Sequence, residues 1–352
     1  MKIRLAILES DEAYLSRITS VFSTKYMDKL EIYSFTTEAG IFHTLAVSRI
    51  DVFLASDTFE IDSQKIPPRC GFAYLVNSAD IETFRGELAL CKFQKAELIY
   101  KQILSIFSEK TAAVRGSGMA DGGRVIMFTG ASGGVGCSSV AAACAIYFAG
   151  KGKKAIYLNL ELLGNSECYF KGEGQGNFSD IIYAVKSRKT NLALKLESLV
   201  KRDESGAYFF SAPNMALDML ELSREEIMQI ITELKTYCGF DYVIPDVNLQ
   251  FGKEMLDFFK CCDDVIVVSD GTETVNSKTK RMLQAMKILE EQGDERHLYD
   301  IGVLYNRFSS RKSKKMEELD IREIGGIKRF EDYPPKQLIT KIAGEDAFRG
   351  LE

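Results

Sequence analysis

A glycine-rich run followed by two serines is the part of this sequence best suited to bind an anion. It reads TGASGGVGCSS over Thr129–Ser139, between an apolar stretch at Val125–Thr129 and an alanine-rich stretch at Val140–Ala149. Successive backbone N–H groups before a helix N-terminus form a concavity that suits phosphate, and glycine lets the backbone approach the anion closely. The run is therefore predicted to be a phosphate loop between a strand and a helix. A glycine-rich turn without a ligand is the alternative.

The loop departs from the phosphate-loop pattern G-x-x-x-x-G-K-[ST] at two positions. Ala131 stands where the first glycine belongs and Cys137 replaces the lysine, whereas Ser138 keeps the hydroxyl that binds Mg²⁺. Backbone amides and Mg²⁺ hold phosphates without a lysine, so we expect nucleotide binding to persist. Phosphoryl transfer should be slow, because positioned cations contribute on the order of 10³–10⁵ in rate. The predicted binding residues of the loop are Ser132, Gly133, Gly134, Val135, Gly136, Cys137, Ser138 and Ser139.

The GGVG sequence with its hydroxyl pair resembles the deviant Walker A loop of the ParA/MinD superfamily, K-G-G-x-G-K-[ST]. Both lysine positions are replaced here, by Ser132 and Cys137. Four later segments are similar to motifs of that superfamily in the same order. They are Leu158–Glu161 at its D-x-D position, Phe240–Asp246 at its Walker B strand, Val267–Asp270 at a later strand end, and Val303–Arg307 at the strand whose Asn faces the base. The resemblance covers roughly Val125 to Pro335.

This resemblance implies that the cofactors are ATP and Mg²⁺. Ser138 and Asp246 would serve the metal, and Glu161 and Asp246 are the candidate catalytic groups. The residues expected near the base are Asn306, Arg307, Tyr333 and Pro334. Asn159 stands in place of an aspartate and cannot act as a carboxylate base, so at most weak ATPase activity is expected.

The same resemblance implies a homodimer, because two subunits commonly face each other across the nucleotides in this superfamily. A cation that replaces the missing lysines is expected from Arg307, from the basic run at residues 311–315, or from the second subunit. The solvated start of a helix is the alternative interpretation of that basic run.

The first 110 residues alternate strand-like and helix-like patterns. An amphipathic helix is predicted from Asp11, as its N-cap, to about Tyr26. The predicted strands, of which the last two are the weaker candidates, are Ile3–Leu8, Leu30–Phe35, Ile50–Ala55, Gly71–Val76 and Ala96–Tyr100. Repeated strand–helix units predict a parallel sheet that is covered on both faces.

This part resembles a response-regulator receiver whose phosphorylation site is damaged. Glu9 and Asp11 are similar to the acidic pair that follows the first strand, and Lys101 is placed at the lysine position. The strand at residues 51–56 puts Ser56 at the acceptor position, and Asp57 comes one residue late. A shift of one residue reverses the side-chain direction on a strand. We therefore expect a protein-docking module rather than an aspartyl-phosphorylated switch.

The second part again shows strand and helix patterns in alternation. Long helical patterns lie at Arg224–Tyr237 and Thr274–Gln292. The predicted strands are Val125–Thr129, Ala155–Leu160, Tyr208–Ala212, Tyr242–Pro245, Val265–Ser269 and Ile301–Tyr305. The fold class is thus α/β with two doubly wound domains, a receiver-like (flavodoxin-like) domain and a P-loop NTPase domain with a mostly parallel sheet. The predicted boundaries are 1–110 for the first domain, 111–124 for a glycine-rich linker and 125–352 for the second domain.

A receiver-like domain joined to a ParA/MinD-like domain without its lysines resembles the TadZ/CpaE group of pilus-assembly localisation proteins. That resemblance implies an ATP-binding scaffold that helps to place a type IVb (Flp/Tad) pilus machine. It implies a cytoplasmic protein held at a cell pole or at the inner face of the membrane by pilus-assembly or polar proteins. The alternatives are a cycling positioning ATPase that acts on DNA or membrane, and a degenerate response-regulator signalling protein.

Composition limits the remaining classes of function. The 352 residues carry 45 Lys and Arg against 50 Asp and Glu, a net charge of −5, which disfavours a chain-wide nucleic-acid binder. No stretch approaches about 20 uninterrupted apolar residues, so a membrane span is not expected. The eight cysteines and two histidines show no zinc-ligand spacing, so no zinc site is expected. Cys137 lies at a predicted helix N-terminus, which lowers the pKa of a thiol, but as a replacement for lysine it needs no redox role.

Overall fold

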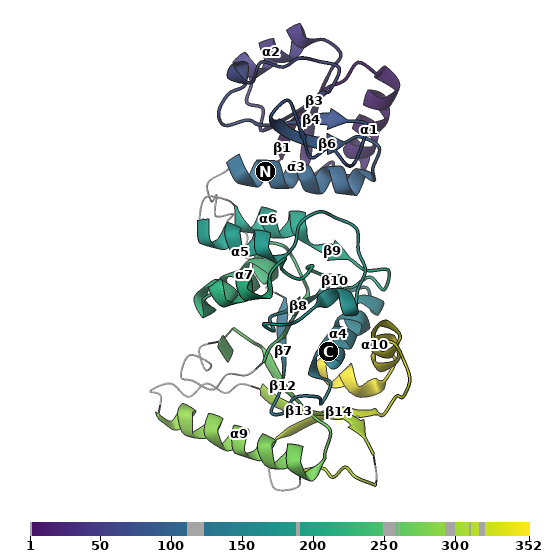
Figure 1. Cartoon of the computed structure of the whole chain (residues 1–352), viewed down its shortest axis with the longest axis vertical. Helices are drawn as coiled ribbons and strands as arrows, with labels where there is room; N and C mark the ends of the chain where they lie inside the picture. Colours follow the sequence, from purple (N-terminus) through teal and green to yellow (C-terminus); the bar gives the residue numbers. More distant parts are fainter. Residues whose placement is uncertain are drawn as a thin grey trace. The chain divides into compact units, whose positions relative to one another are not determined.

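The computed structural model describes residues 2–110, 123–187, 191–248, 258–259, 261–292, 300–309, 311–316 and 321–352. Contacts divide the chain into two compact units, residues 1–115 with 186–199 and residues 116–185 with 200–352. Both units are α/β with mostly parallel sheets, so the predicted fold class is confirmed (Figure 1). Most of the predicted linker, residues 111–122, lies outside the described residues.

The first unit has a flavodoxin-like sheet. Its strands lie in the order β2-β1-β3-β4-β6-β5, and all neighbours are parallel except β5 and β6. Without the short β5 this is the 2-1-3-4-5 order of a doubly wound sheet. The elements are β1 Ile3–Leu8, α1 Glu12–Lys25, β2 Leu30–Phe35, α2 Glu38–Val47, β3 Val52–Ser56, β4 Gly71–Val76, β5 Thr83–Phe84, β6 Glu87–Cys91, α3 Ala96–Lys110 and α6 Leu192–Leu199.

The prediction of a strand at Ala96–Tyr100 is wrong. These residues form the start of α3, and the fifth parallel strand is β6. Ile99, Ile103 and Phe107 are buried at intervals of four, which is the spacing of one helix face. A window of five apolar-rich residues does not distinguish a helix from a strand, whereas the longer pattern does.

Helix α6 belongs to the first unit although it lies between elements of the second in the chain. It packs against α3 and buries Leu192 and Leu196. The Asn191 N–H donates to the Ser108 carbonyl at 3.2 Å, and Lys195 Nζ donates to Ser105 Oγ at 3.0 Å. The first unit is therefore assembled from two separate stretches of the chain.

The second unit contains the strand order β14-β13-β12-β7-β11-β8-β10-β9, with only the β9–β10 pair antiparallel. β14 was not predicted, because its two glycines and its charged residues obscure the strand pattern. The elements are β7 Arg124–Gly130, α4 Cys137–Gly150, β8 Ala155–Asn159, α5 Phe178–Ser187, β9 Lys201–Arg202, β10 Tyr208–Phe209, α7 Arg224–Thr236, β11 Tyr242–Asp246, β12 Asp264–Ser269, α9 Glu273–Gln292, β13 Asp300–Phe308, β14 Arg322–Lys328 and α10 Pro335–Ala343.

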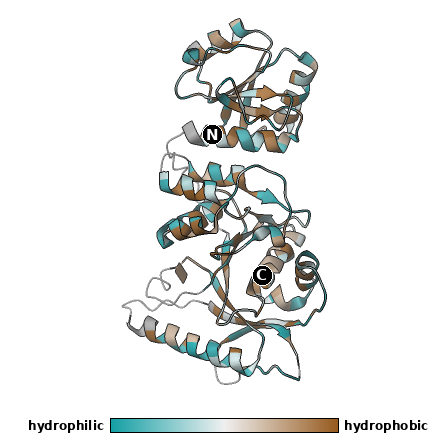
Figure 2. Cartoon of the chain, viewed as in Figure 1, coloured by the Kyte–Doolittle hydropathy of each residue, from teal (hydrophilic) through white to brown (hydrophobic). Residues whose placement is uncertain are grey.

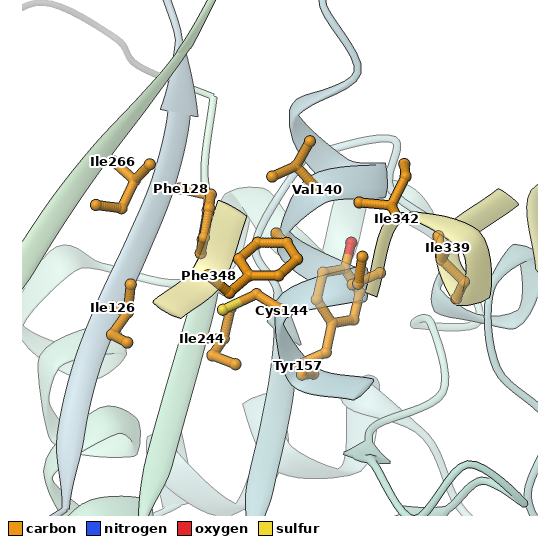
Figure 3. Packing of buried hydrophobic residues seen from close by; sticks show 14 of the residues in the cluster. Ile126, Phe128, Val140, Cys144, Tyr157, Ile244, Ile266, Ile339, Ile342 and Phe348 are labelled. Atoms are coloured by element: carbon orange, nitrogen blue, oxygen red, sulfur yellow. The ribbon is translucent and has the colours of Figure 1, made fainter. Parts of the chain in front are cut away.

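Helix α4 is enclosed on nearly all sides. Apolar residues concentrate in the strands of both sheets, including those against which α4 packs (Figure 2). Figure 3 shows Val140 and Cys144 of α4 next to Phe348 and to Ile342 of α10. The consecutive alanines Ala141–Ala143 are fully buried, and their small side chains let α4 lie close to the sheet. The end of β7 and the start of α4, which the phosphate loop joins, are thereby held in place.

Candidate functional site

The loop between β7 and α4 has the backbone conformation that its glycines permit. Gly134 and Gly136 have φ angles of +81° and +83°, and Gly136 is the N-cap of α4. A Cβ atom at Gly136 would lie 2.5 Å from Asn306 Nδ2, so only glycine fits there. Val135 is buried and anchors the middle of the loop. The predicted strand, loop and helix all form at the expected positions.

Asn306 and Arg307, near the end of β13, bind the β7–α4 loop from one side. Asn306 Nδ2 donates to the Val135 carbonyl and Arg307 Nη1 donates to the Gly134 carbonyl, both at 2.8 Å. Because a trans peptide points its C=O and N–H in opposite directions, the N–H groups of Val135 and Gly136 face away from this clamp. A register shift between Tyr305 and Phe308 and a φ of +55° at Arg307 aim the two side chains at the loop.

Three of the predicted chemical groups meet beside the first turn of α4. Ser138 Oγ donates to Glu161 Oε2 at 3.2 Å, and the Ser138 hydroxyl also acts to lower the pKa of the nearby Asp246 carboxyl. Asp246 ends β11 and pairs in register with Asn159, the last residue of β8. Parallel neighbouring strands thus bring their carboxyl ends, and these oxygen donors, to one edge of the sheet.

Asp246 is fully buried and bonded to neutral groups. Tyr157 donates its hydroxyl to Asp246 Oδ2 at 2.7 Å, and Cys137 Sγ lies 3.6 Å from Oδ1. Burial raises the pKa of Asp246 to about 7, with a further contribution from the negative charge of Glu161. Among the described residues no basic side chain forms an ion pair with Asp246 or Glu161. Within the described ranges, the site therefore holds carboxylates without a compensating cation.

This donor set fits a magnesium ion that is bound together with phosphates. Mg²⁺ prefers hard oxygen ligands and is commonly held by one or two carboxylates and the phosphates of its nucleotide. Ser138 and Asp246 supply such oxygens. In the described part of the chain no group of three His, Cys, Asp or Glu side chains could hold a metal ion alone, so the phosphates would have to complete the coordination.

The expectation of a lowered pKa at Cys137 is wrong. The Cys137 side chain is partly buried, and the pKa of its thiol is raised well above the ordinary value by desolvation and by the negative charges of Asp246 and Glu161. The effect of a helix N-terminus on a thiol is local, whereas burial depends on the whole fold. Cys137 is therefore a neutral hydrogen-bond partner of Asp246 and not a reactive thiolate.

The other predicted site residues lie in different surroundings. Tyr333 precedes α10 and contacts Phe330 edge to face at 6.3 Å between ring centroids, and Pro334 is the N-cap of α10. In the basic run at residues 311–315, Lys315 pairs with Glu323 at 2.6 Å. The roles of Tyr333 and Pro334 at the base stay predictions.

Two residues of the site, Tyr157 and Lys278, were not predicted. Tyr157 donates its hydroxyl to Asp246, and Asn159 Nδ2 lies 3.2 Å from the Tyr157 hydroxyl. Their alternation along β8 is a signal in the sequence, since residues two apart on a strand share a face. Lys278 of α9 brings its Nζ to 3.3 Å from Ser132 Oγ. No local pattern links these two positions, which are 146 residues apart in the chain.

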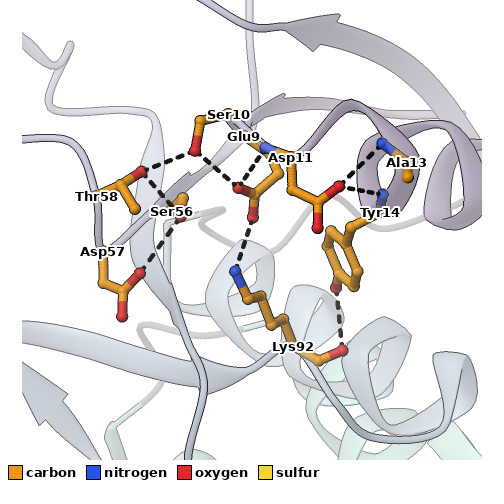
Figure 4. Close-up of polar contacts among 9 residues, drawn as sticks. All are labelled: Glu9, Ser10, Asp11, Ala13, Tyr14, Ser56, Asp57, Thr58 and Lys92. Atoms are coloured by element: carbon orange, nitrogen blue, oxygen red, sulfur yellow. Dashed lines mark hydrogen bonds and ion pairs between the residues drawn. The ribbon is translucent and has the colours of Figure 1, made fainter.

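The first unit holds a second polar cluster, at the carboxyl ends of β1 and β3 (Figure 4). Lys92 Nζ lies 3.3 Å from Glu9 Oε2, and both side chains are buried, with exposed fractions of 9% and 1%. Ser56 Oγ accepts from Thr58 Oγ1 at 3.2 Å and lies 3.4 Å from Asp57 Oδ1. The two buried charges of this cluster, on Glu9 and Lys92, are thus paired within the protein.

The structure corrects the predicted lysine of this cluster. Lys101 lies on α3 and pairs with Glu97 at 3.7 Å, and Lys92, directly after β6, takes the place beside Glu9. The error follows from the wrong strand at Ala96–Tyr100. Asp11 accepts from the N–H groups of Ala13 and Tyr14 at 3.0 Å each, so its predicted role as the N-cap of α1 is confirmed.

Comparisons with known proteins give one match for the first unit and others for the second. Residues 1–108 match the sequence family described as TadZ-like, receiver domain. A ParA family ATPase from Chlorobium tepidum TLS is 18% identical, with a TM-score of 0.50, and the match covers 65% of this chain and 92% of that one. The septum site-determining protein MinD of Pyrococcus horikoshii OT3, solved with Mg-ADP, is 15% identical with a TM-score of 0.46, and the match covers 62% of this chain and 94% of that one. A variant of the Cyanothece protein McdA, solved in complex with ATP, is 15% identical with a TM-score of 0.49, and the match covers 65% of this chain and 96% of that one.

These findings confirm the resemblance of the first unit at the level of sequence and that of the second unit at the level of the fold. The first unit is similar in sequence to TadZ-like receiver domains, and the second has the fold of the ParA family ATPase. No curated protein sequence matches the chain significantly. None of the helices in the described ranges is long and apolar enough to cross a membrane.

Proposed function

We propose that this chain binds Mg-ATP and acts as a localisation scaffold for assembly of a type IVb (Flp/Tad) pilus, with slow or no ATP hydrolysis. The observation that carries the proposal is a shaped phosphate loop placed beside carboxylates that have no basic partner among the described residues. The match of the first unit to TadZ-like receiver domains supports the role in pilus assembly.

The phosphates would be held by main-chain amides of residues 133–139 and by the N-terminus of α4. Ser138 would bind the metal directly and Asp246 through water, and bound Mg²⁺ would neutralise charge on the carboxylates and phosphates. Asn306 and Arg307 would flank the base. Their contacts with the Val135 and Gly134 carbonyls would also keep the amides on the opposite side of the loop available to the nucleotide.

Slow hydrolysis follows from the groups that the loop and β8 lack. No side chain from Thr129 to Ser139 carries a positive charge. Asn159 is engaged with Tyr157 and with the Glu161 N–H, and an amide cannot take up a proton as a carboxylate base does. Bound ATP would thus act mainly as a structural ligand.

An apolar surface beside the site supports dimer formation. A groove of about 620 Å³ begins at Leu160 and Glu161 and is lined largely by apolar side chains. Leu163 is 82% exposed at its rim, and Leu220 is also exposed. Exposed apolar side chains that gather in one place are typical of protein interfaces. We propose that a second copy of the chain covers this surface when Mg-ATP is bound.

Calorimetry and light scattering of the whole chain test the proposal. Mg-ATP should bind with a measurable heat and shift the mass from monomer to dimer, and phosphate release should stay near background. Leu163→Asp should prevent the dimer but not ATP binding, whereas Tyr183→Asp, at another exposed apolar residue, should change neither. No binding of any nucleotide, or a mass that ATP does not change, would contradict the respective part of the proposal.

A cycling positioning ATPase is the alternative that the fold of the second unit favours. Strong stimulation of phosphate release by DNA or by lipid vesicles would support it over the scaffold. Stimulation should be absent if ATP serves as a structural ligand.

A further inference from the structure

We propose that Lys278 of α9 supplies the cation that the phosphate loop lacks, and that it contacts the terminal phosphate of bound ATP. The inference rests on the proposed binding of ATP. In an ordinary phosphate loop, a lysine of the loop itself reaches the β- and γ-phosphates. Here the two positions that carry lysine in the related loops are Ser132 and Cys137, so a cation at the phosphates would come from outside the loop.

The position of Lys278 matches that requirement. Its Nζ lies 3.3 Å from Ser132 Oγ, at one of the two replaced positions. The side chain is exposed, and in the part of the chain that the structure describes no carboxylate pairs with it. An ammonium group without a counter-charge beside an anion-binding loop can form a charge-assisted hydrogen bond to phosphate.

The start of α9 is anchored, so Lys278 projects from a defined position. Asn276 is buried, accepts from Ser269 Oγ at 3.1 Å and donates to the Lys314 carbonyl at 2.8 Å. Val275 belongs to the same buried cluster as Val135 of the loop. The backbone that carries Lys278 is therefore fixed relative to the loop.

Two of the other expected cations are already engaged. Arg307 donates to the Gly134 carbonyl, on the side of the loop opposite to the amides of Val135 and Gly136. Lys315 of the basic run pairs with Glu323. Amides at the start of α4 would hold the inner phosphates, whereas Ser132 lies on the strand side of the loop. A cation at Ser132 would therefore act on the outer end of the triphosphate.

The test compares Mg-ATP and Mg-ADP binding to the whole chain by calorimetry. Lys278→Met should weaken ATP binding about tenfold and ADP binding much less, since one charge-assisted hydrogen bond to the terminal phosphate is lost. Lys287→Met removes another exposed lysine of the same helix and should leave both affinities unchanged. Lys278→Arg keeps the charge and should retain most of the preference for ATP.

A rescue variant separates a phosphate contact from a contact that only supports the loop. Ser132→Lys in the Lys278→Met background places an ammonium group on the loop and should restore the ratio of ATP to ADP affinity. Equal losses for ATP and ADP, or the same loss in Lys287→Met, would overturn the role of Lys278 while leaving ATP binding intact. Absence of nucleotide binding by the unaltered chain would overturn the proposed function, and this inference with it.

Discussion

The two polar clusters of this chain differ in how their charges are balanced. In the receiver-like unit, Lys92 pairs with Glu9 inside the protein, and the hydroxyls around Ser56 bond to one another and to Asp57. In the ParA-like unit, Asp246 and Glu161 have no described basic partner, and the ammonium group of Lys278 has no described carboxylate partner. The buried charges of the first cluster are paired with each other, whereas the described carboxylates and the described ammonium group of the second are not paired with each other.

This difference indicates which cluster serves a ligand. A buried charge without a partner destabilises the folded state, and a fold retains it when a ligand compensates the charge. A buried ion pair with both partners present has no such requirement. The damaged receiver cluster is thus interpreted as part of the structure, and the phosphate loop with its carboxylates as a binding site.

The largest effect is expected when the self-satisfied cluster loses one partner. Lys92→Met leaves the Glu9 carboxylate buried without a counter-charge, which should lower the free energy of unfolding by about 3–5 kcal/mol. Hydrogen exchange of peptides from β1 and β6 in the whole chain measures this loss. Lys65→Met, at an exposed pair with Asp62 in the same unit, should cost less than about 1 kcal/mol.

The double variant Glu9→Gln with Lys92→Met sharpens this result. It removes both charges, so its cost should be smaller than that of Lys92→Met alone. If Lys92→Met costs no more than Lys65→Met, the pair does not stabilise the unit and the contrast between the two clusters fails.

The next effect is a dependence of stability on pH that arises at Asp246. Its pKa in the folded protein is about 7, above the ordinary value of 3.8. Between these values the folded state binds more protons than the unfolded chain, so the free energy of unfolding falls as pH rises. From pH 5 to pH 7 the loss should be about 2–3 kcal/mol for the nucleotide-free protein.

Asp246→Asn should remove this slope, because an amide does not titrate. The test unfolds the unaltered chain and Asp246→Asn in urea at a series of pH values and monitors unfolding by hydrogen exchange of β11 peptides. A stability that rises from pH 5 to pH 7, or an unaltered slope in Asp246→Asn, would show that Asp246 is compensated in the folded protein.

A smaller effect is expected from the glycines of the loop. Gly136→Ala forces a non-glycine residue to φ +83° and brings Cβ toward Asn306, at a cost of about 2 kcal/mol and with a loss of ATP binding. Gly150→Ala, at the other end of α4, meets no atom within 4 Å and does not need a positive φ, so it is the matched control. Equal ATP affinity in the two variants would argue that the shape of the loop is unimportant.

The sequence was sufficient for features that depend on neighbouring residues. The β7–loop–α4 unit and the carboxylate at the end of β11 follow from local patterns, and both were predicted correctly. The contact of Lys278 with Ser132 and that of Tyr157 with Asp246 join distant positions and need the tertiary fold. The direction of the pKa shift at Cys137 was predicted wrongly for the same reason, because burial outweighs the local effect of the helix.

The smallest effect is expected from phosphorylation of the receiver-like unit. Acetyl phosphate with Mg²⁺ should leave the mass of the intact chain unchanged, because Ser56 is fully buried and Lys92 is held by Glu9. Ser56→Asp restores an acceptor carboxylate but should also stay unlabelled, since Asp11 is engaged in capping α1 and leaves Glu9 as the only remnant of the acidic pair. Intact-mass spectrometry beside an active receiver as a positive control decides the matter. Labelling of Ser56→Asp alone would mean that one substitution separates this cluster from a working site, and labelling of Asp57 in the unaltered chain would mean that the cluster is a ligand site after all.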